Sequence, residues 1–208
     1  MVDYSGKDLF ARNLVVTWIA HGFVLATGFI VPRLISDSLG QETLGLWDLC
    51  WVAVRYLTLS RFGVGTALSR SVALNRSRNN YSLLAQSVTA VICWQLVIGI
   101  IIAFVAFYFG GAFVNWAGVS GELDQSRAEL VFRLIILSLA VNMIVTPANA
   151  LLSGYHRWDI LNGLNGFHDV MLAVAMVGLL YLGHGIEHLA WAVFLNSIFS
   201  ALIRVVIA

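Results

Sequence analysis

The stretch LLAQSVTAVICWQLVIGIIIAFVAFYF, residues 83–109, decides the fold class, because it contains no Asp, Glu, Lys or Arg. A helix needs about 20 mostly apolar residues to cross the hydrocarbon core of a bilayer. The whole chain has the same character, since 60% of its 208 residues are hydrophobic and only 11% are charged. Soluble domains carry about 25% charged residues. The sequence therefore predicts an all-α, polytopic membrane protein.

Apolar segments of spanning length recur on both sides of this stretch and give six expected spans joined by short loops. They are Leu14–Ile35, Leu44–Val72, Leu83–Phe109, Val131–Leu152, Trp158–Leu182 and a last span from Ile186 to the end. We expect residues 1–208 to form one membrane domain, a six-helix bundle without an extramembrane domain. Because the chain stops in or just after an apolar segment, we expect it to be a fragment of a longer protein.

Lys and Arg residues in short loops predict which side of the membrane is cytoplasmic. One side of the expected spans carries Lys7, Arg12, Arg70, Arg76, Arg78, Arg157 and Arg204. The other carries Arg33, Arg127 and Arg133 beside the acids Asp37, Glu42, Glu122, Asp124, Glu129 and Glu187. The first group predicts a cytoplasmic N-terminus.

Polar residues inside the apolar segments recur at helical spacing and predict which faces turn away from lipid. In five of the six expected spans they share one face: Asn13, Thr17 and His21, with Gly28 and Pro32; Asp48, Arg55, Thr66 and Arg70, if the helix is straight through Gly63 and Gly65, where it can break; Ser138, Asn142, Thr146, Asn149 and Ser153; Asp159, Asn162, Asn165 and Asp169; Asn196, Ser200 and Arg204. Five such faces indicate a common polar cavity. The alternative for each Ser, Thr or Asn is a hydrogen bond between helices, worth about 0.6–2 kcal/mol.

Asp169 and Arg55 are the strongest candidates for function, because a charge deep in the bilayer costs about 2.5–3.5 kcal/mol or more. Asp169 stands 11 residues into its segment, roughly 16 Å along a helix and near the bilayer midplane. The structural alternatives are a protonated or hydrogen-bonded carboxyl group for Asp169, and for Arg55 an ion pair with Asp48 or another carboxylate. His21 is a weaker candidate for ion coupling, because a single His in a span is more often a packing residue.

The patterns needed for soluble catalysis or for a cofactor do not occur in the sequence. No GxxxxGK[ST], GxSxG or HExxH motif is present, and Cys50 and Cys93 stand apart in apolar stretches. A net charge of +1 argues against a nucleic-acid surface. We therefore expect no enzyme activity, no cofactor and no metal site.

Three short segments resemble bacterial polysaccharide-biosynthesis flippases. They are VPRLISDSLGQETLGLW at 31–47, FGVGTALSRSVA at 62–73 and LSGYHRWDILN at 152–162. The matching residues are Gly63, Gly65, Ala67, Leu68 and Arg70 in the second segment and Gly154, Arg157, Asp159 and Asn162 in the third. The segments occur in the family's order and spacing. The chain departs from the family pattern at Arg61–Phe62, where a carboxylate is usual.

The flippases belong to the multidrug/oligosaccharidyl-lipid/polysaccharide exporter superfamily, whose members have two lobes of six helices, often with two more. The resemblance implies that this chain is the N-terminal lobe of such a transporter in the bacterial inner membrane. Its substrate would be a polyprenyl-diphosphate-linked oligosaccharide, moved by alternating access without covalent chemistry. Membrane lipid surrounds such a protein, and polysaccharide polymerases or glycosyltransferases are its expected partners.

For this substrate, Arg55 and Arg70 are expected to attract the diphosphate, since a guanidinium matches phosphate geometry. Asn142, Asn149, Asn165 and Asp169 are expected to bind sugar hydroxyls, and ion coupling would fall to Asp169 and His21. One alternative is a cation-coupled drug or metabolite exporter of the same superfamily, which a cavity rich in acids and aromatic residues would favour. A second is a non-transporting membrane scaffold for polymer synthesis, to which the cavity charges would not matter.

Overall fold

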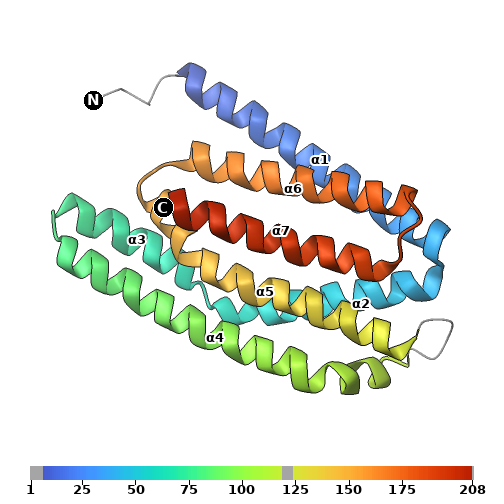
Figure 1. The fold of residues 1–208 in the computed structure, drawn as a ribbon. Helices are drawn as coiled ribbons and strands as arrows, with labels where there is room; N and C mark the ends of the chain where they lie inside the picture. Colours follow the sequence, from blue (N-terminus) through green and yellow to red (C-terminus); the bar gives the residue numbers. More distant parts are fainter. Residues whose placement is uncertain (1–6, 119–123, 208) are drawn as a thin grey trace.

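A computed structural model describes the backbone of residues 7–118 and 124–207, with side chains at Trp18 and from Leu25 onward. The described chain consists of helices joined by short turns and contains no strand, which confirms the all-α prediction. The elements, drawn in Figure 1, are α1 (Lys7–Leu39), α2 (Gln41–Thr58), the 3₁₀ helix η1 (Leu59–Arg61), α3 (Val64–Ser77), α4 (Tyr81–Trp116), α5 (Gln125–Gly154), α6 (Trp158–Tyr181) and α7 (Ile186–Ile207).

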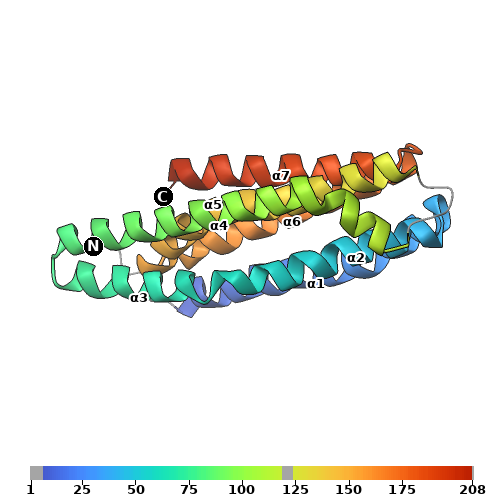
Figure 2. The same cartoon turned by 90° about the horizontal axis from the view of Figure 1, so that it is seen from below.

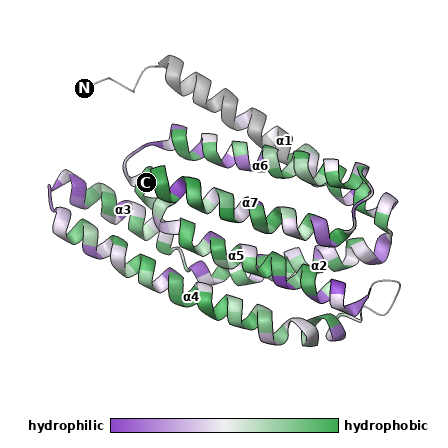
Figure 3. Ribbon diagram, in the orientation of Figure 1, coloured by the Kyte–Doolittle hydropathy of each residue, from purple (hydrophilic) through white to green (hydrophobic). Residues whose placement is uncertain are grey.

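The helices lie in two layers, with α1, α2 and α3 on one side and α4, α5, α6 and α7 on the other (Figure 2). α5 is the central helix, because it packs against α2, α3, α4, α6 and α7. Its side chains Ile135, Ile136 and Met143 are fully buried. α4 and α7 carry exposed large apolar residues such as Phe104 and Phe199, and both helices are mostly hydrophobic in Figure 3. Apolar outer faces of this kind suit contact with lipid.

The second expected span, Leu44–Val72, is wrong as a single helix. The chain instead forms α2 and α3, separated by the short turn η1. After η1, Phe62 and Gly63 adopt left-handed backbone conformations, with φ of 46° and 68°, and a right-handed helix cannot continue through them. α3 follows α2 along the same layer (Figure 2). The sequence indicates a departure from straightness at Gly63 and Gly65, but it does not predict the left-handed Phe62, since Phe rarely adopts a positive φ.

Among the described residues, four helices are long and apolar enough to cross a membrane: α4, α5, α6 and α7. They contain the third to sixth expected spans. The first expected span, Leu14–Ile35, lies within α1, but several of its side chains, that of His21 included, fall outside the described residues. The described structure therefore supports four membrane-spanning helices, and the six-span count is not confirmed.

The connections between helices collect at two ends of the bundle (Figure 1). One end holds the α3–α4 and α5–α6 turns and the last turn of α7. Near this end stand Arg70, Arg76, Arg78 and Arg157, and none of them forms an ion pair with a described residue. Arg76 instead lies over a ring from the α5–α6 turn, 4.5 Å from the centroid of Tyr155. These four guanidinium groups leave this end strongly basic.

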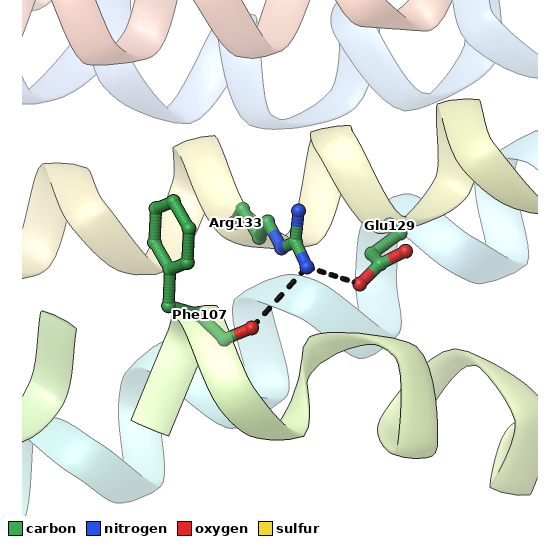
Figure 4. A network of polar contacts seen from close by, with 3 residues as sticks. All are labelled: Phe107, Glu129 and Arg133. Atoms are coloured by element: carbon green, nitrogen blue, oxygen red, sulfur yellow. Dashed lines mark hydrogen bonds and ion pairs between the residues drawn. The ribbon is translucent and has the colours of Figure 1, made fainter. Parts of the chain in front are cut away.

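The opposite end holds the α1–α2 and α6–α7 connections, the end of α4 and the start of α5, and here each described arginine has a carboxylate partner. Arg33 pairs with Asp37 at 3.7 Å, and Arg127 pairs with Glu187 at 3.8 Å. The third pair, Arg133 with Glu129, is drawn in Figure 4, where Arg133 also donates to the backbone carbonyl of Phe107 at 3.2 Å. Among the described residues, the four arginines Arg70, Arg76, Arg78 and Arg157 thus lie at one end and Arg33, Arg127 and Arg133 at the other, and only the second set is paired with carboxylates.

Candidate functional site

A cavity of about 390 Å³ lies between α1, α2 and α6. Its volume falls within the range of about 300–1,000 Å³ that small-molecule sites usually occupy. The lining mixes charged, aromatic and aliphatic residues: Thr27, Gly28, Val31, Pro32, Trp47, Asp48, Trp51, Arg55, Asp169, Leu172, Ala173 and Met176. Segments that are far apart in the sequence therefore build one site.

Each helix presents residues to the cavity at helical spacing. On α2, Asp48 and Arg55 are seven residues apart and lie on one face, with Trp51 between them. On α6, Asp169 and Met176 are seven residues apart in the same way. The faces that the sequence predicted for this part of α2 and for Asp169 on α6 therefore meet across the cavity.

Two carboxylates and one guanidinium line the cavity, from Asp48, Asp169 and Arg55. All three residues are exposed to its space. Asp169 and Arg55 are the two residues that the sequence singled out, and the structure brings them to the same cavity from α6 and α2. Counted by residue type, the three side chains carry a formal charge of −1. The site combines both signs of charge in a small volume.

Two tryptophans on α2, which do not belong to the polar faces predicted from the sequence, also line the cavity. Trp47 is only 4% exposed, and its ring meets that of Trp51 edge to face, with centroids 6.0 Å apart and planes at 69°. The spacing of these residues in the sequence predicts this placement, because Trp47, Trp51 and Arg55 recur every four residues and so share a helical face. Indole rings beside charged groups give the cavity flat surfaces for stacking.

Asn142 was expected to bind substrate, but it lies between α5 and α7 and is not part of the cavity lining. Its amide nitrogen donates to the carbonyl of Ser138 at 2.9 Å and to the hydroxyl of Ser197 at 3.2 Å. Both contacts join polar groups inside the helix bundle. This residue therefore follows the alternative of interhelical hydrogen bonding.

Asn149 and Asn165 were also expected to bind substrate, but the side-chain oxygens of both accept hydrogen bonds from Arg204 of α7. Arg204 donates from one terminal nitrogen to the Asn149 side-chain oxygen at 3.0 Å and from the other to the Asn165 side-chain oxygen at 2.7 Å. Neither amide lines the cavity. The sequence placed Arg204 on a polar face of the last span but did not predict that these amides would be its partners.

Arg70 and His21 complete the set of predicted site residues. Arg70 is an exposed residue of α3 and does not line the cavity, because the break at Phe62 and Gly63 ends the face that begins at Asp48. The single polar face drawn from Asp48 to Arg70 on a straight helix is therefore wrong. The side chain of His21 lies outside the described residues, so the ion-coupling prediction for it remains a prediction.

Comparison of the chain with protein-family models, with curated proteins and with solved structures found no match. The resemblance to flippases therefore rests on the three short segments alone. Two of their glycines have a direct structural role: Gly63 adopts a left-handed conformation, and an added Cβ at Gly154 would lie 2.7 Å from Val72 Cγ1. Among the described residues, no group of three His, Cys, Asp or Glu side chains could hold a metal ion.

Proposed function

We propose that the protein is a membrane transporter that translocates a polyprenyl-diphosphate-linked oligosaccharide, with its solute bound in the cavity between α1, α2 and α6. The observation that carries the proposal is the meeting of Arg55 and Asp169 in one cavity. Charged residues at such a position in a spanning bundle mark solute or ion paths more often than packing sites. A scaffold would not need them.

The proposal assigns the chain to one six-span lobe of a two-lobed transporter. In this scheme α1 is the first span, and α2, η1 and α3 together form the second as a discontinuous helix. Interrupted helices beside the solute site are a recurring feature of transporters, which rock their repeats around it. The end that carries the unpaired arginines Arg70, Arg76, Arg78 and Arg157 faces the cytoplasm of a bacterium, since basic loops are retained inside.

Within the cavity, the roles follow from side-chain chemistry. Arg55 binds a phosphate oxygen pair, because its planar donors match phosphate geometry. Asp48 and Asp169 accept hydrogen bonds from sugar hydroxyls, and the indole of Trp51 provides a face for a sugar ring. Asn142, Asn149, Asn165 and Arg70 have no part in this scheme, since none of them lines the cavity.

A second candidate function is cation-coupled export of a drug or metabolite. Two carboxylates and two tryptophans outnumber the single guanidinium of the cavity, and this composition favours an organic cation, which aromatic faces and carboxylates both attract. The two candidates differ in the sign of the charge on the solute. They are therefore distinguished by giving the same preparation an anionic lipid and a cationic dye.

The test is a leaflet-exchange assay in liposomes that contain the purified protein. A fluorescent polyprenyl-diphosphate-linked sugar is distributed over both leaflets, and an impermeant reductant then bleaches the outer one. A flippase exposes nearly all of the probe to bleaching, whereas protein-free liposomes lose about half. In parallel, ethidium uptake is measured with and without a proton or sodium gradient. Lipid exchange without gradient-driven ethidium movement supports the proposal, and the reverse result assigns the second function.

A further inference from the structure

Arg204 is a buried cation that the cavity does not include. It stands in the last turn of α7 and is only 8% exposed. Its two terminal nitrogens bridge Asn149 of α5 and Asn165 of α6. Its third donor, Nε, has no hydrogen-bond partner among the described residues. Three helices thus converge on one guanidinium.

Two amide oxygens cannot account for a buried guanidinium by themselves, because they are neutral. A charge removed from water is tolerated when a counter-charge accompanies its hydrogen bonds. On α6, the carboxylate of Asp169 stands one helical turn from Asn165, to which Arg204 donates at 2.7 Å. The amide and the carboxylate therefore lie on adjacent turns of the same face.

Asp169 therefore has two arginines in its surroundings. Arg55 of α2 lines the same cavity, and Arg204 of α7 bonds to Asn165, one turn before Asp169 on α6. The other ionisable groups near it are Asp48, across the cavity, and His168, its neighbour on α6. With Arg204 included, two carboxylates and two guanidinium groups balance, so the site is electrically neutral when His168 is uncharged.

We propose that Arg204 is the counter-charge of Asp169 and holds this carboxylate in place at the cavity wall. Its two terminal nitrogens fix the spacing of α5, α6 and α7 through the two amides, and its positive charge attracts the Asp169 carboxylate. Arg204 is thus a positioning residue of the solute site, although it does not line the cavity. Its part in transport rests on the proposed function, but the pairing with Asp169 does not.

A double-mutant cycle on the purified protein tests the pairing without any transport assay. Thermal unfolding is followed by tryptophan fluorescence for the unmodified protein, Arg204→Gln, Asp169→Asn and the double variant. We expect Arg204→Gln to lower the midpoint by about 5 °C or more, because it leaves a carboxylate uncompensated. The double variant removes both charges and should return to within about 2 °C of Asp169→Asn alone.

A role of Arg204 confined to the two amides predicts a different result. The loss caused by Arg204→Gln would then be the same with and without Asp169→Asn, and that additivity overturns the pairing. Failure of the double variant to fold also overturns it, since the neutral pair should be tolerated. Arg204→Lys keeps the positive charge but loses the paired terminal nitrogens of the guanidinium. The unfolding midpoint of this variant should therefore still change when Asp169→Asn is added.

The lipid-exchange assay provides the second readout. Arg204→Lys should retain exchange above that of Arg204→Gln, because the charge and not the pair of terminal nitrogens orients Asp169. Coupling in the cycle without exchange in the unmodified protein would leave the pairing intact and refute the proposed function. Lipid exchange by the unmodified protein, with no energetic coupling between Arg204 and Asp169 in the double-mutant cycle, would refute the role of Arg204 and leave the proposed function intact.

Discussion

Replacing Gly154 by alanine is expected to lower the free energy of unfolding by about 1–3 kcal/mol, as overpacking of a tight contact usually does. A Cβ at this position would lie 2.7 Å from Val72 Cγ1 and 3.0 Å from the backbone carbonyl oxygen of Ser69. Val72 is fully buried and cannot move aside. Here α3 crosses the end of α5, and the neighbouring contact, Ser153 to Ser69 at 2.8 Å, would also be strained.

Gly163→Ala is the matched control, because an added Cβ there meets no atom within 4 Å. In a helix, alanine is favoured over glycine by about 1 kcal/mol, so this variant should be as stable as the unmodified protein or more stable. Both variants are measured by thermal unfolding in the same detergent. Adding Val72→Ala to Gly154→Ala should recover part of the loss. Equal stability of the two single variants would contradict the close approach of α3 to α5.

Replacing Arg55 by alanine is expected to abolish lipid exchange while the protein remains folded in the membrane. The change removes the only guanidinium of the described cavity lining and leaves Asp48 and Asp169 as the charged groups of that lining. Losing a buried, hydrogen-bonded charge contact with a ligand costs about 2–5 kcal/mol, so the exchange rate should fall by roughly 100-fold. Arg55→Lys should be intermediate, since an ammonium group cannot bind a phosphate through two parallel hydrogen bonds.

The control for this variant is Arg33→Ala. Arg33 has an exposed side chain, pairs with Asp37 one turn away and does not line the cavity. Exposed pairs of this kind contribute little to stability, so exchange should be unchanged. Exchange at the full rate in Arg55→Ala, with the protein present at the normal level, would remove Arg55 from the solute path.

The parts of the structure that follow from local pattern could be predicted from the sequence. Apolar length predicts α4 to α7, and helical spacing predicts that Asp48 and Arg55 share a face. These inferences need only the geometry of one helix. Gly63 indicated where the second span could break, but the left-handed conformation of Phe62 was not predicted, because Phe seldom adopts a positive φ.

The partners of the polar residues could not be predicted, because they depend on how helices pack together. Asn149, Asn165 and Asp169 lie on faces that the sequence identified, yet two of them bind Arg204 and only the third reaches the cavity. Spacing along one helix assigns a face but does not say which neighbour that face meets. An asparagine in a span therefore carries less functional information than a charge at the same depth.

A solute path through the cavity requires that Asp169 face water and not lipid, and cysteine accessibility measures this. The native cysteines, Cys50 and Cys93, are first replaced by serine or alanine. Single cysteines are then placed at the cavity positions Thr27 and Asp169 and at two exposed positions nearby that do not line it, Phe29 and Val170.

An impermeant, charged thiol reagent reacts with the thiolate, which forms in water and not in hydrocarbon. The structure predicts rapid labelling at positions 27 and 169 and little or none at 29 and 170. Labelling at 29 and 170 with none at 27 and 169 would place Asp169 against lipid and contradict the proposed solute path.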